Sequence, residues 1–82
     1  MRLDKYLKVS RIIKRRTVAN DACDASHVSV NGRVVKASYD VKVGDEISVS
    51  FGARTVKVRV LSVKDVVKKE DAVSLYEVIS EA

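Results

Sequence analysis

The sequence has very little of what catalytic and metal-binding domains need. Among its 82 residues are one cysteine, one histidine, three glycines and no proline or tryptophan. One cysteine excludes an internal disulfide and a cysteine-based metal cluster, and one histidine leaves no second imidazole to share a metal ion. The glycines form no phosphate-cradling loop, and no serine lies in a recognisable nucleophile motif. We therefore expect a protein that is not an enzyme, with no catalytic residue, metal or cofactor.

Long apolar stretches are also missing. No apolar run approaches the roughly 20 residues that span a bilayer, and the first residues form no apolar secretory segment. We therefore expect no membrane association and a cytoplasmic location. The chain contains no repeat, low-complexity tract or linker, so residues 1–82 are expected to form one small domain with a modest core.

Positive charge is concentrated in the first part of the chain. The formal net charge is +5, and residues 1–36 contain nine Lys or Arg against three Asp, a net of +6. The remaining residues contain seven basic and eight acidic side chains, a net of −1. Such segregation produces self-repulsion unless a polyanion neutralises it, which favours a nucleic-acid partner. A solvated helix face and attraction to acidic lipid remain the alternatives on charge alone.

Two helices are expected within this basic part. Residues 2–13 have helical spacing, and the stripe expected in the core is Leu3, Tyr6, Leu7, Ser10 and Ile13. A second helix is expected over about 16–25, with its apolar side formed by Val18, Ala19, Ala22 and Cys23. Ser26 would be its exit residue, and Cys23 is expected to act as a small buried apolar residue rather than a nucleophile.

From residue 28 the hydrophobic period becomes two, which predicts strands. Asn31-Gly32 between β-branched runs is a strong hairpin signal, because a type I′ turn needs positive φ at both positions. Residues 37–46 are expected to be a loop, followed by strands over about 47–51 and 55–60. The last strand is expected to end or bulge near Leu61. Helical spacing over about 68–80 predicts a C-terminal helix. The fold class is therefore α+β, with two N-terminal helices packed on a small, mostly antiparallel β-sheet.

Four motifs in register resemble the S-four RNA-binding domain, named after a small-subunit ribosomal protein. They are Arg2-Leu3-Asp4-Lys5-Tyr6-Leu7, Lys14-Arg15-Arg16-Thr17-Val18-Ala19, His27-Val28-Ser29-Val30-Asn31-Gly32 and Val41-Lys42-Val43-Gly44-Asp45-Glu46-Ile47. The resemblance covers about residues 1–50 and implies the bent-sheet αL-type fold of that domain, with residues 51–82 supplying an extra strand and the C-terminal helix. Ser26 departs from the family, which often has glycine there.

The whole chain is similar to the stand-alone members of this family that act in bacterial ribosome quality control, the RqcP family, which is related to the heat-shock S-four proteins. The resemblance implies binding to large ribosomal subunits obstructed by peptidyl-tRNA, through contacts with large-subunit rRNA and tRNA. It also implies support of C-terminal alanine tailing together with the alanine-tailing factor RqcH. A general rRNA-binding or ribosome-assembly factor, or an accessory module of an rRNA-modifying enzyme, remains the alternative. A monomer is expected.

The basic side chains are the expected RNA-binding residues: Arg2, Lys5, Lys8, Arg11, Lys14, Arg15, Arg16 and Arg33. Arginine is favoured over lysine because its planar fork can bridge two phosphate oxygens or stack on a base. Arg15 and Arg16 are the strongest candidates, since free N–H groups at the start of a helix favour a phosphate. Asp4 is expected to pair with Lys8 or an arginine, and Tyr6 to pack in the core rather than stack on RNA.

Overall fold

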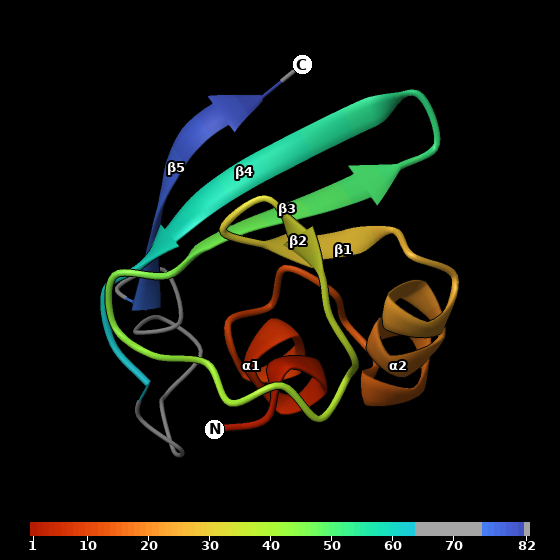
Figure 1. Ribbon diagram of the computed structural model, residues 1–82, viewed down its shortest axis with the longest axis horizontal. Helices are drawn as coiled ribbons and strands as arrows, with labels where there is room; N and C mark the ends of the chain where they lie inside the picture. The colour runs from red at the N-terminus through yellow and green to blue at the C-terminus, as the bar shows by residue number, and fades with distance from the viewer. Residues whose placement is uncertain (64–74, 82) are drawn as a thin grey trace.

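The computed structural model describes residues 1–63 and 75–81, and Figure 1 shows its arrangement. Within these residues the chain forms two helices followed by five strands of one sheet. They are α1 (Leu3–Val9), α2 (Arg16–Asp24), β1 (Val28–Val30), β2 (Arg33–Val34), β3 (Glu46–Phe51), β4 (Arg54–Val60) and β5 (Tyr76–Glu81). The predicted α+β class, with the helices first, is confirmed. Neither helix of the described ranges is long or apolar enough to cross a membrane.

The strands lie in the order β2-β1-β3-β4-β5, and every neighbouring pair is antiparallel. The register aligns Val30 with Ile47 and Ile47 with Val58, and all three side chains are buried. Because side chains alternate across a strand, the neighbouring row of Ser29, Ser48 and Lys57 points to the opposite face. Both helices lie on the same side of the sheet (Figure 1), so they cover the valine-rich face and leave the other face open.

The Asn31-Gly32 hairpin forms as predicted. Both residues have positive φ, 53° and 83°, and Val30 pairs with Arg33 across the turn. The Asn31 side chain also accepts a hydrogen bond from the Glu46 amide (3.0 Å) and donates one to Asp45 (3.1 Å). These bonds join the hairpin tip to the turn at Gly44 that precedes β3, so the two turns stabilise one another.

The first helix is shorter than predicted, because it ends at Val9 rather than near residue 13. Arg11 then adopts a φ of +63°, which no helix continues through. Ile13 is nevertheless buried, since the chain turns back and the Ile13 amide donates to the Leu7 carbonyl at 3.0 Å. The predicted stripe therefore reaches the core, but its last member does so from a turn.

The second helix ends one residue before its predicted end, and Ser26 follows with a φ of +64°. Ser26 is thus the exit residue that the sequence indicated, in the conformation for which glycine is favoured. Ala19 and Cys23 are buried as expected, whereas Val18 is 49% exposed, so its assignment to the apolar side was wrong. The cause is the narrow stripe that a helix of nine residues offers to its neighbours α1 and β1.

The predicted C-terminal helix is wrong over residues 76–80, which belong to strand β5; residues 68–74 lie outside the described residues. β5 pairs antiparallel with β4, with an irregularity between Lys57 and Val58. The helical spacing of Leu75, Tyr76 and Ile79 misled the interpretation. Aromatic and β-branched residues such as Tyr76, Val78 and Ile79 also favour strands, and β4 supplied an edge on which they could pair.

Candidate nucleic-acid interface

Seven of the eight predicted RNA-binding residues lie on α1 or α2, directly before α1, or in the turn between the two helices. Arg2 precedes α1, Arg15 precedes α2, and Arg16 is the first residue of α2. Lys5 and Lys8 lie on α1, Arg11 and Lys14 lie in the connecting turn, and Arg33 lies apart on β2. All eight are exposed or half-buried. The fold therefore collects most of the predicted set on its helical side.

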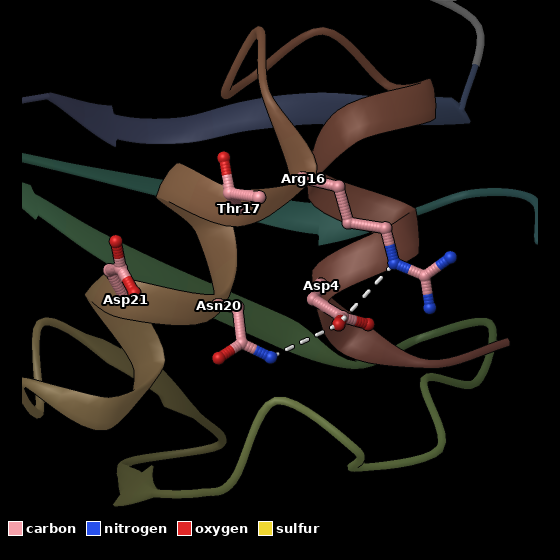
Figure 2. A pocket seen from close by; sticks show the side chains of 5 residues that line it. All are labelled: Asp4, Arg16, Thr17, Asn20 and Asp21. Atoms are coloured by element: carbon pink, nitrogen blue, oxygen red, sulfur yellow. Dashed lines mark hydrogen bonds and ion pairs between the residues drawn. The ribbon is translucent and has the colours of Figure 1, made fainter.

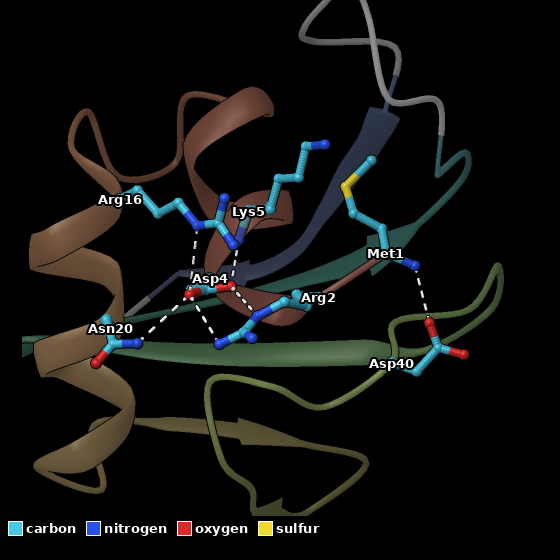
Figure 3. Close-up of polar contacts among 7 residues, drawn as sticks. All are labelled: Met1, Arg2, Asp4, Lys5, Arg16, Asn20 and Asp40. Atoms are coloured by element: carbon cyan, nitrogen blue, oxygen red, sulfur yellow. Dashed lines mark hydrogen bonds and ion pairs between the residues drawn. The ribbon is translucent and has the colours of Figure 1, made fainter.

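Asp4 joins two of these arginines, as Figure 3 shows. Arg2 Nε lies 3.2 Å from Asp4 Oδ1, and Arg16 Nε lies 3.4 Å from Asp4 Oδ2. Asn20 Nδ2 donates to Oδ2 at 3.4 Å and the Lys5 amide donates to Oδ1 at 2.8 Å. The predicted pairing of Asp4 with an arginine is thus confirmed, and it involves Arg2 and Arg16 rather than Lys8.

The Asp4 carboxylate is charged although it is only 2% exposed. Burial alone would raise its pKa, but hydrogen bonds from Arg2, Asn20, the Lys5 amide and Arg16 together hold the pKa below its ordinary value. A buried carboxylate with several donors keeps its charge because each donor replaces a lost water molecule. Asp4 is therefore a buried negative centre that contacts two partly exposed positive side chains.

An open hollow lies beside this cluster, between the start of α1 and the exposed side of α2. Figure 2 shows the five residues that line it: Asp4, Arg16, Thr17, Asn20 and Asp21. Its lining combines hydrogen-bond donors and acceptors. A surface of this kind suits a polar partner with both functions, as a ribonucleotide has in its phosphate, base edge and 2′-hydroxyl.

The start of α2 adds further positive character. Arg15 occupies the position before the helix with extended backbone, and no side chain caps the first turn. The first turn also contains no acidic residue. Its free N–H groups and the positive end of the helix dipole therefore lie beside Arg15 and Arg16, as the sequence indicated.

The cations of the open sheet face are neutralised by neighbouring carboxylates. Lys57 Nζ lies 3.2 Å from Glu46, while Arg59 lies 3.6 Å from Glu46 and 2.8 Å from Glu77. By contrast, within residues 1–63 and 75–81, five of the predicted RNA-binding residues make no ion pair: Lys8, Arg11, Lys14, Arg15 and Arg33. The uncompensated positive charge is thus mainly on the helical side.

Two other side chains considered in the sequence analysis, Tyr6 and Cys23, lie in the hydrophobic core. Tyr6 is fully buried, as predicted, and Cys23 is buried with its pKa raised to about 11 because burial disfavours the thiolate. A thiol with that pKa is protonated at neutral pH and is a poor nucleophile. In the described part of the chain, no three His, Cys, Asp or Glu side chains gather in a way that could hold a metal ion.

Sequence reasoning missed Asp4 as the residue that joins Arg2 to Arg16, and it missed Asn20 entirely. The sequence does show that Asp4 lies in the first turn of a helix, but a favourable interaction with the helix dipole is enough to explain an acidic residue there. The contact with Arg16 depends on how α1 and α2 pack together. That packing has no signature in the local spacing.

The chain matches the model of one protein family and is similar to individual proteins from several bacteria. A family model described as the S4 domain matches residues 1–47, more than half of the chain. A Streptococcus pneumoniae protein named RQC P-site tRNA stabilizing factor is 57% identical over 81 residues, covering 99% of this chain and 92% of the relative. A Bacillus subtilis protein of the same name is 53% identical, covering 99% and 94%.

A solved structure is similar over almost the whole chain. Heat Shock Protein 15 of Vibrio cholerae, described as trimeric, superposes with a TM-score of 0.89 at 27% sequence identity. The match covers 98% of this chain and 82% of that chain. The helices and the sheet thus form an arrangement that is shared with a known protein, including strand β5 beyond the family-model match.

Proposed function

Since the chain belongs to the S4 domain family, and within it to the RQC P-site tRNA stabilizing factors, we propose that it binds large ribosomal subunits obstructed by peptidyl-tRNA. The observation that carries this proposal is the distribution of charge. Seven of the eight candidate cations lie on α1 or α2, directly before α1 or in the connecting turn, while Lys57 and Arg59 of strand β4 are paired with carboxylates. A polyanion would therefore meet the helical side.

Binding would depend on phosphate contacts and shape more than on base sequence. Lysine and arginine neutralise phosphates and release counterions, which gives affinity without sequence information. Arg2, Arg11, Arg15 and Arg16 would add bidentate contacts or stacking, and Lys5, Lys8, Lys14 and Arg33 would add charge. These contacts would go to large-subunit rRNA and to the tRNA. The chain would act as a binding factor rather than an enzyme.

The chain would hold tRNA and rRNA in a fixed arrangement while a second factor extends the stalled nascent chain. That factor would be the alanine-tailing factor RqcH, which the chain would meet on the ribosome. The chain would act in the cytoplasm, as a monomer. The relatives' printed name, with its reference to stabilising a P-site tRNA, supports the holding role. Because the similar Vibrio cholerae protein is described as trimeric, the molar mass of this protein in solution should be measured alongside its RNA binding.

The proposal is tested by crosslinking the tagged protein to RNA in living cells and sequencing the recovered fragments. Joint recovery of tRNA and large-subunit rRNA is expected. Recovery of rRNA without tRNA would favour a general rRNA-binding or assembly factor instead. Recovery of messenger RNA alone would contradict both.

A further inference from the structure

We propose that Asp4 is a positioning residue, which holds Arg2 and Arg16 side by side so that both can bind the same stretch of RNA backbone. This inference rests on the proposed RNA-binding function and names the residue that organises its site. Asp4 itself would not touch RNA, because its side chain is 3% exposed. It would act through the two guanidinium groups that it contacts.

The way in which each arginine contacts Asp4 leaves donors for a second partner. Arg16 contacts Asp4 through Nε at 3.4 Å, and Figure 2 draws no contact from its two terminal nitrogens to the residues shown. Arg2 uses Nε at 3.2 Å and one terminal nitrogen at 3.5 Å. Since a guanidinium has five N–H donors, both arginines keep unused donors while they remain anchored. Their side chains are 52% and 48% exposed, so these donors are accessible.

The electrostatics require such an anchor. Two guanidinium groups repel one another, and arginine side chains lose rotamer freedom when they are held in one place. Asp4 lies between them in a partly buried setting, where its charge attracts them more strongly than an exposed carboxylate would. The ordering is therefore complete before RNA arrives, which reduces the entropy lost on binding. The Asp4, Arg2 and Arg16 cluster still has a net charge of +1.

A simple charge effect and a positioning effect predict opposite results for Asp4→Asn. Removing a negative charge from a surface that binds a polyanion should strengthen binding on electrostatic grounds alone. If Asp4 positions the arginines, the substitution should instead weaken binding, by about tenfold for the loss of one well-placed charged contact. Asp24→Asn is the matched control, because Asp24 is exposed at the end of the same helix α2, lies outside the lining of the hollow and forms no ion pair with either arginine in the described structure. It should not weaken binding.

The measurement is binding of full-length variants to purified large ribosomal subunits carrying peptidyl-tRNA, with folding checked by circular dichroism. A double-mutant cycle separates positioning from a general structural role. In the Arg2→Ala/Arg16→Ala background, Asp4→Asn should cause no further loss. A full, additive loss in that background would overturn the proposal, as would tighter or unchanged binding of the single variant.

A second variant covers the case in which Asp4→Asn does not fold. Arg16→Lys keeps the charge, but its ammonium is a single point that can contact either Asp4 or a phosphate. We expect it to bind as weakly as Arg16→Ala, and wild-type affinity would overturn the proposal. Wild-type protein that does not bind the subunits would instead refute the proposed function itself, so the two failures are distinguishable.

Discussion

The hydroxyl of Tyr6 donates a 2.6 Å hydrogen bond to the backbone carbonyl of Leu75, a residue 69 positions later in the chain. Both side chains are buried. The bond therefore links the first helix to the residue that precedes the last strand. It also explains why Tyr6 is unavailable to stack on RNA, since its ring and its hydroxyl are both engaged inside the fold.

Replacing Tyr6 with phenylalanine should reduce stability without changing RNA binding. The variant keeps the ring but loses a buried hydrogen bond, which costs about 1 kcal/mol of unfolding free energy. Urea denaturation measures the loss. Tyr39→Phe is the control, because Tyr39 donates to Asp45 at 3.2 Å in a more exposed place and should lose less. Equal stability of Tyr6→Phe and wild type would contradict the role of the bond.

Much of the fold was predictable because its signals are local. The change from helical to alternating spacing near residue 28 marks the transition from helices to sheet, and Asn31-Gly32 specifies its own turn. The C-terminal segment was not predictable in this way. Tyr76 and Ile79 satisfy both helical spacing and strand preference, and only pairing with β4 decides between them.

The candidate site was predictable as a set of charges but not as an arrangement. Net charge located the positive side chains, and the start of α2 was evident from the sequence. The contact between Asp4 and Arg16 arises from packing of α1 against α2, which spacing does not encode. The exposure of Val18 was unpredictable for the same reason, because packing buries fewer residues of α2 than its apolar spacing indicated.

Ser26→Gly should stabilise the protein. Ser26 has a φ of +64°, which is unfavourable for a residue with a side chain, so glycine should raise the unfolding free energy by up to about 1 kcal/mol. The same substitution at Ser29, which lies in strand β1, should destabilise by roughly 0.5–1 kcal/mol. Thermal unfolding of the two variants provides the check, and a shift in the same direction for both would contradict this explanation.

Acid should destabilise the wild type more than Asp4→Asn. The pKa of Asp4 is lowered in the fold, so its charge contributes stability above the ordinary pKa of about 4. That contribution disappears as the pH falls through the lowered folded value. Guanidinium denaturation at pH 7 and pH 3 measures the difference between the two proteins. If the difference in unfolding free energy between wild type and Asp4→Asn is as large at pH 3 as at pH 7, the charge of Asp4 adds no stability.

High pH should remove the contribution of Cys23 to stability, whereas low pH removes that of Asp4. Burial raises its pKa to about 11 from an ordinary value of 9.0, so the buried thiol contributes stability below pH 9 and loses it as the pH rises toward 11. The stability advantage of wild type over Cys23→Ala should therefore shrink between pH 9 and 11. Rapid alkylation of native Cys23 at pH 8 would contradict its buried, protonated state.

Binding should be strongly dependent on salt. With about four phosphates neutralised, the slope of log affinity against log salt should be roughly −3 to −4. Lys57→Ala should leave the slope unchanged, because Lys57 lies on the open sheet face beside Glu46. Affinity that is insensitive to salt would indicate a protein partner instead of RNA.

The most direct test of the RNA-binding side is co-sedimentation of Arg15→Ala/Arg16→Ala with large ribosomal subunits carrying peptidyl-tRNA. Both residues are exposed, so the variant should fold normally by circular dichroism. We predict that wild type and Lys57→Ala sediment with the subunits, while the double variant stays in the supernatant. Co-sedimentation of the double variant at the wild-type level would contradict the assignment of α1, α2 and their connecting turn as the RNA-binding surface.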